Sequence, residues 1–175
     1  IAIFLIVRDK KKEVKNNSTS VAPPIAFKDV FIGAVQILKK PQIWFCGLVG
    51  CLLYLSLSTF AELWGIPYLE TAHHLTQDEA SRSLPMLFLG WTVGGPLVGW
   101  ISDAIGRRLL PLIIGAIGGS AMVAALLYLP SPSLMTINLL LFLFGLFASA
   151  EVIVFAIARE SCPPQLAASA LAIVN

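Results

Sequence analysis

Long stretches of this chain carry no charged side chain. None lies within residues 41–61, 83–102 or 109–150. A hydrocarbon core of about 30 Å takes about 20 apolar residues in helical form, so the first two stretches each predict one membrane helix and the third predicts two. The Pro-Ser-Pro-Ser sequence at 130–133 predicts the turn inside the third stretch. A mean hydropathy of +0.84 also exceeds that of soluble domains, and the sequence predicts an all-α, polytopic membrane protein.

The predicted elements follow one another with short connections, apart from one long linker. The predicted spans are 43–66, 84–102, 109–129 and 134–156, with the end of an earlier helix at 1–7 and the start of a further, truncated helix at 166–175. Residues 8–40 form the linker, and residues 41–175 form the transmembrane bundle. Within the linker, apolar residues recur at helical spacing over 27–40, which predicts an amphipathic helix suited to a membrane surface.

Basic residues fall almost entirely on one side of the membrane if the spans alternate. On that side lie Arg8, Lys10, Lys11, Lys12, Lys15, Lys28, Lys39, Lys40, Arg107, Arg108 and Arg159, and Arg82 lies on the other. The excess of lysine and arginine marks the cytoplasmic side, so residues 8–40 and 103–108 are predicted to be cytoplasmic. Short loops and the lack of eukaryotic targeting signals favour a bacterial inner membrane.

Several local features have simpler explanations than a separate function. The glycosylation sequons at 16–19 lie on the cytoplasmic side, away from the glycosylation machinery. The lysine cluster at 10–12 is better explained by attraction to anionic lipid than by nucleic-acid binding. The three cysteines lack metal-ligand spacing and are interpreted as reduced thiols, and we expect no metal or other cofactor.

One motif stands between the second and third complete spans. It reads Gly99-Trp-Ile-Ser-Asp103-Ala-Ile-Gly106-Arg107-Arg108. In physical terms it predicts a tight cytoplasmic turn. The first glycine would allow close helix contact, the second would supply backbone freedom, and the carboxylate would accept hydrogen bonds from a helix N-terminus or a basic side chain. The two arginines would anchor the next helix at the headgroups.

This motif resembles the signature loop of the major facilitator superfamily, with Ala104 where the family usually has a basic residue. The loop occurs there between helices 2 and 3 and again between helices 8 and 9. The long basic linker before it resembles the family's central loop, so the resemblance implies that the chain runs from the end of helix 6 to the start of helix 11 of a twelve-helix fold. The partner implied by the resemblance is the N-terminal half of the same transporter.

Two membrane carboxylates are the first candidates for a site. Glu151 lies about two turns from the cytoplasmic Arg159, and Glu62 lies about one turn before Pro67. An ionisable group within a span is costly unless it has a partner or water. Glu151 can carry a proton as a cavity alternates its exposure, or it can hold a neighbouring helix. Glu62 can act at the outer mouth of the cavity, or it can be a solvated side chain near the membrane interface.

Tyr54, Ser58 and Trp64 complete the candidate pathway. In the family, helices 7 and 10 line the central cavity, and these three residues lie on the predicted helix 7. The two aromatic side chains can contact substrate, or they can serve as packing and interfacial anchors. The chain shows no phosphate-binding loop, nucleophile set or metal cluster, so we expect no enzyme.

The sequence therefore predicts a secondary active transporter of a small solute that works by alternating access, with proton-coupled symport favoured. Proton-coupled efflux by antiport is the alternative in the same class. A transporter-like receptor or scaffold is the alternative in another class.

Overall fold

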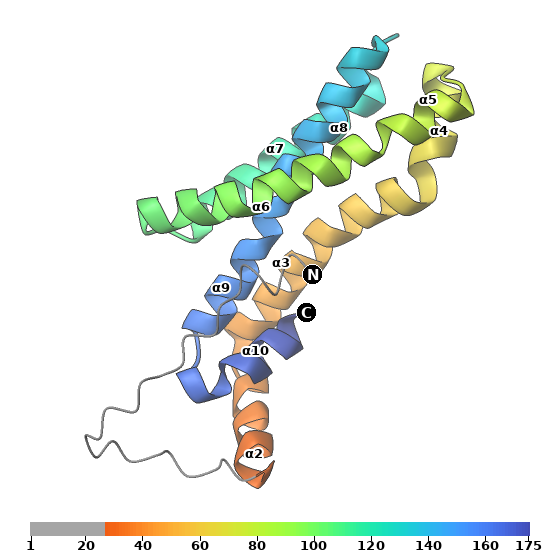
Figure 1. Cartoon of the computed structure of the whole chain (residues 1–175). Coiled ribbons are helices and arrows are strands. Elements are labelled where there is room, and N and C mark those ends of the chain that lie inside the picture. The colour runs from red at the N-terminus through yellow and green to blue at the C-terminus, as the bar shows by residue number, and fades with distance from the viewer. Residues whose placement is uncertain (1–26) are drawn as a thin grey trace, which may run out of the picture.

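The computed structural model describes residues 27–175, with side chains from Gly33 onward, and every described element is a helix (Figure 1). The elements are α2 Phe27–Leu38, α3 Pro41–Ser58, the π-helix η1 Thr59–Trp64, α4 Gly65–His73, α5 Gln77–Ser83, α6 Pro85–Ile105, α7 Leu109–Tyr128, α8 Leu134–Ala148, the 3-10 turn η2 Ser149–Glu151, α9 Val152–Glu160, the 3-10 turn η3 Pro164–Leu166 and α10 Ala167–Val174. The predicted helix end at 1–7 and linker residues 8–26 lie outside the described residues.

Helices of sufficient length and hydropathy to cross a membrane match the predicted complete spans in number. Among the described residues they are Pro41–His73, Gln77–Ile105, Leu109–Tyr128 and Leu134–Glu160. The all-α, membrane-spanning fold is thus confirmed, although three of the four spans are longer than predicted.

The first of these spans continues past a proline. The predicted span ends at residue 66, directly before Pro67, which has no N–H to donate. In the structure a π-helical segment, Thr59–Trp64, precedes it, and the Gly65 N–H bonds to the Phe60 carbonyl five residues earlier. This wider turn changes the hydrogen-bond register before the proline, so the helix continues to His73.

The other boundaries differ for local reasons. The second span begins at Gln77 rather than 84, because Thr76 and Glu79 form a capping box that starts a polar helical turn ahead of Pro85. It ends at Gly106, whose φ of 68° is in the left-handed region, as the predicted turn requires. The last span continues through η2 to Glu160 rather than ending at 156.

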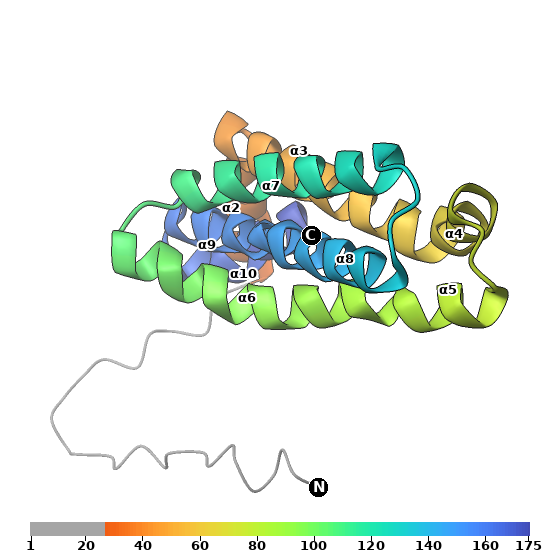
Figure 2. The same ribbon diagram turned by 90° about the horizontal axis from the view of Figure 1, so that it is seen from above.

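Helix α8 is the centre of the bundle and lies between α6 and α7 (Figure 2). Glycines stand where the backbones meet. A Cβ on Gly90 would overlap the Phe142 carbonyl oxygen, and a Cβ on Gly145 would overlap the Leu87 carbonyl oxygen. Small residues allow this approach in lipid, where packing rather than hydrophobic force joins helices.

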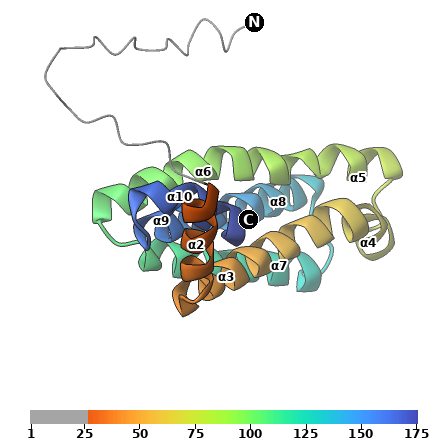
Figure 3. The same ribbon diagram turned by 90° about the horizontal axis from the view of Figure 1, so that it is seen from below.

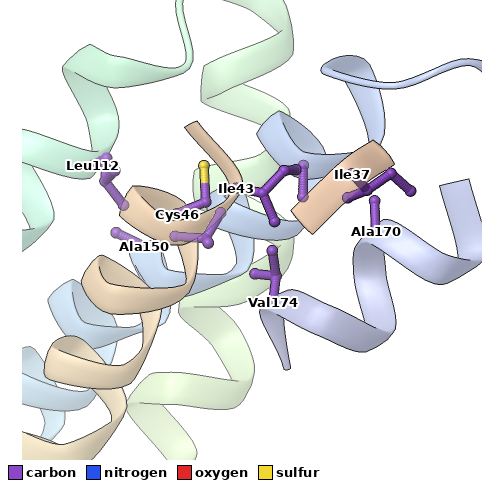
Figure 4. Close-up of a cluster of buried hydrophobic side chains, with 9 residues drawn as sticks. Ile37, Ile43, Cys46, Leu112, Ala150, Ala170 and Val174 are labelled. Carbon is purple, nitrogen blue, oxygen red and sulfur yellow. The ribbon is translucent and has the colours of Figure 1, made fainter. Parts of the chain in front are cut away.

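Helix α2 lies across α3 and α10 (Figure 3). Its Ile37 is 1% exposed and belongs to a buried cluster with Ala170 and Val174 of α10 (Figure 4). A Cβ on Gly33 would overlap the Leu166 side chain. The predicted amphipathic helix therefore uses part of its apolar face for contact with protein, which composition alone did not indicate.

The α6–α8 contact gives a direct test of packing. We expect Gly90→Ala to destabilise the fold by about 1–3 kcal/mol, because the overlap outweighs the gain of about 1 kcal/mol that alanine normally brings to a helix. The measurement is the Tm of the purified full-length protein in detergent. Gly99→Ala on the same helix is the control, since a Cβ there meets nothing within 4 Å. Equal Tm values for the two variants would contradict close packing at Gly90.

Candidate functional site

Glu151 is buried where α8 passes into α9. It is the last residue of the 3-10 turn η2. The residue is 9% exposed, and its Oε2 atom has no hydrogen-bond partner among the described residues. An ionised carboxylate in such surroundings is costly unless water, a cation or a hydrogen-bond donor reaches it.

Glu151 lines a cavity of about 520 Å³ between α3, α6, α9 and the end of α10. That volume is within the usual range for small-molecule sites. Its lining residues are Gly50, Cys51, Tyr54, Trp91, Glu151, Val152, Val154, Phe155, Val174 and Asn175. Of the predicted candidates, Tyr54 thus lies in the same cavity as Glu151. The cavity is otherwise mostly apolar, with few polar groups to orient a ligand.

The turn that carries Glu151 is held by its neighbour Ser149. This fully buried serine donates a hydrogen bond of 2.7 Å from its Oγ to the Leu146 carbonyl oxygen. It also packs directly against Gly94 of α6, where a Cβ would overlap the Ser149 Oγ. Gly94 thus leaves space for the 3-10 turn, and the turn determines how Glu151 is oriented at the start of α9.

The remaining predicted pathway residues lie further along the span Pro41–His73, which also carries Tyr54. Ser58 donates to the Leu55 carbonyl oxygen at 3.4 Å. Glu62 is exposed in η1. Trp64 is 64% exposed and lines a separate groove against Val123 of α7. The structure therefore groups Tyr54 with Glu151, and it does not place Ser58, Glu62 or Trp64 among the residues that line their cavity.

The sequence prediction missed Trp91 and Phe155. Within the described residues, the buried Nε1 atom of the Trp91 indole has no hydrogen-bond partner, and neither has the Oε2 atom of Glu151. Phe155 could have been found, because it lies one helical turn after Glu151 and so shares its face. Trp91 lies on α6, where no pathway residue was predicted, and its sequence neighbours gave no sign of the cavity.

At the cytoplasmic end predicted from charge, Arg108 joins the ends of three helices. Its Nη2 donates to Glu160 Oε1 at 2.7 Å and its Nη1 donates to Ser102 Oγ at 3.0 Å. Nη1 also donates to Asp103. Hydrogen bonds to Glu160 and then to Asp103 raise the pKa of the Arg108 guanidinium, so the charge is permanent. The arginine that starts α7 is thereby linked to the ends of α6 and α9.

This geometry corrects two expectations about the signature loop. Arg108 binds carboxylates of the protein, whereas the sequence predicted contact with headgroups; Arg107 remains exposed. Gly99 was expected to allow close helix contact, yet a Cβ at this position would meet nothing within 4 Å in the described part of the chain. The close contacts on this helix lie at Gly90 and Gly94, nearer to the membrane interior.

The Arg108 cluster can be tested by a double-mutant cycle. We expect Arg108→Gln and Glu160→Gln each to lower the Tm of the full-length protein, and the double variant to lower it by less than the sum, because both changes remove the same ion pair. Arg107→Gln is the matched control and should leave the Tm unchanged. Additive losses for Arg108 and Glu160 would show that the two side chains do not act together.

Comparison with known families adds evidence over the whole chain. The family model described as Major Facilitator Superfamily matches residues 1–175. No curated protein and no solved structure matches the chain.

Proposed function

Because the chain belongs to the major facilitator superfamily, a family of membrane transporters, we propose that it carries a small solute by proton-coupled symport. The observation that supports this proposal best is the carboxyl group of Glu151, buried beside a cavity with no partner for its Oε2 atom. Such a group needs a proton, a cation or a donor in at least part of the transport cycle.

In the proposed cycle Glu151 takes up a proton while the cavity is open to the outside and releases it when the cavity opens to the cytoplasm. The two halves of the transporter rock about this site, and the half that precedes the linker supplies the opposite wall. Tyr54 contributes a ring and a hydroxyl group to the substrate surface. Ser58, Glu62 and Trp64 belong to the outer part of the pathway, with Glu62 at its mouth.

The signature loop serves as the cytoplasmic closure in this proposal. Gly106 supports the turn and Asp103 and Arg108 tie it to α9, while Arg107 and Gly99 are free to meet other groups when the state changes. Residues 8–40 and 103–108 lie on the cytoplasmic side of a cell membrane, which we propose to be a bacterial inner membrane. Membrane lipids surround the bundle.

The proposal predicts that Glu151→Gln abolishes accumulation of the transported solute, because glutamine stays neutral and cannot release a proton. The measurement is uptake of labelled organic acids, sugars, amino acids and lipophilic cations by cells that express the full-length protein, with and without a protonophore. A protonophore should abolish uptake by the wild type. Glu70→Gln, on α4 outside the cavity, is the matched control and should transport normally.

Two other outcomes would contradict symport. If the protonophore and Glu151→Gln both raise accumulation, the protein exports its substrate by antiport, with proton and substrate competing for Glu151. If neither treatment changes the accumulation of any compound, the result favours a substrate outside the panel or a transporter-like receptor or scaffold over symport of the compounds tested.

A further inference from the structure

Two buried polar atoms without hydrogen-bond partners among the described residues belong to side chains that line the same cavity. They are the Nε1 atom of Trp91 on α6 and the Oε2 atom of Glu151 at the start of α9. The indole nitrogen can only donate a hydrogen bond, and an unmade hydrogen bond at a buried group costs free energy. The structure gives no hydrogen bond between the two residues, so neither atom satisfies the other.

The rest of the cavity surface limits the chemistry of its ligand. Val152, Val154 and Val174 are apolar, and the rings of Tyr54 and Phe155 add aromatic surface. Besides Glu151, the titratable side chains among the described lining residues are those of Cys51 and Tyr54. These described residues include no lysine, arginine or histidine, so they carry no fixed positive charge toward the ligand.

We propose that Trp91 and the protonated carboxyl group of Glu151 form a two-donor site for the carboxylate of a small organic acid with an apolar body. The proposal rests on the proposed symport and names its substrate class. The Trp91 N–H donates to one carboxylate oxygen, and the O–H of protonated Glu151 donates to the other. The apolar side chains and rings cover the body of the acid.

This arrangement explains why proton and substrate would travel together. Ionised Glu151 offers only acceptor oxygens, which repel the carboxylate of the substrate. Protonated Glu151 offers a donor and removes the like charge. The pair of one proton and one carboxylate is also neutral, which suits a cavity whose described walls carry no basic side chain.

Cys51 provides a probe of occupancy that is independent of transport, because this exposed cysteine lines the same cavity. The experiment measures alkylation of Cys51 by N-ethylmaleimide in the full-length protein, by peptide mass spectrometry. Monocarboxylates from acetate to benzoate are compared with the amide and the amine of the same carbon skeleton. We expect protection by at least one carboxylate, and weaker or no protection by its amide and amine.

Variants then test the two donors. Trp91→Phe keeps the ring but removes the N–H, and it should raise the carboxylate concentration for half-protection about tenfold or more. Trp100→Phe on the same helix is the control, because Trp100 is 70% exposed and lies outside the cavity. Glu151→Gln should keep protection, since its amide still donates, and Glu151→Leu should lose it.

The outcomes separate this inference from the proposed function. Protection by amines in place of carboxylates, or equal half-protection in Trp91→Phe and Trp100→Phe, would overturn the two-donor site. After either result, the proposed symport would still be supported if Glu151→Gln abolishes proton-driven accumulation. Retained accumulation in Glu151→Gln would overturn the proposed function even if carboxylates protect Cys51.

Discussion

The close approach of α8 to its neighbours is the contact on which the rest of this bundle depends. Gly90 and Gly145 remove the side chains that would hold α6 and α8 apart, and Gly115 does the same where α7 meets Ala150. In lipid, apolar side chains gain little by leaving the solvent, so van der Waals contact at short range must supply the association. The glycines make that contact possible along much of α8.

The same close contact determines where the candidate site lies. Gly94 admits Ser149, whose hydrogen bond to Leu146 holds the 3-10 turn before Glu151. The turn changes the direction of the residues that follow, and Glu151 meets the cavity between α3, α6 and α10. Burial of a carboxyl group without a partner opposes folding. The main physical support for a ligand site is that Glu151 and Trp91 line one cavity and that each has a buried polar atom without a partner among the described residues.

The opposite requirement applies at the helix ends predicted to be cytoplasmic. There Arg108 forms ion pairs with Asp103 and Glu160, and all three side chains remain partly exposed. Lys40 donates from its Nζ atom to the Ser161 carbonyl oxygen at 2.8 Å and so links the start of α3 to the end of α9. Water can replace such partners at modest cost, so these links can break during a conformational change. The paired charges at the helix ends and the buried carboxyl group of Glu151 are therefore held in opposite ways.

Hydropathy and charge determined how many membrane helices to expect and where they turn, because lipid forces long apolar helices to satisfy their own backbone hydrogen bonds. They also indicated Glu151, since a carboxylate inside an apolar run is rare. The motif from Gly99 to Arg108 indicated the family that the chain resembles. The sequence did not show that the helix continues past Pro67, because a π-helical register shift depends on hydrogen bonds rather than on residue type. Only the tertiary structure placed Trp91 of α6 in the cavity that Glu151 lines and paired Arg108 with Glu160, because residues distant in sequence come together only through the way the helices cross.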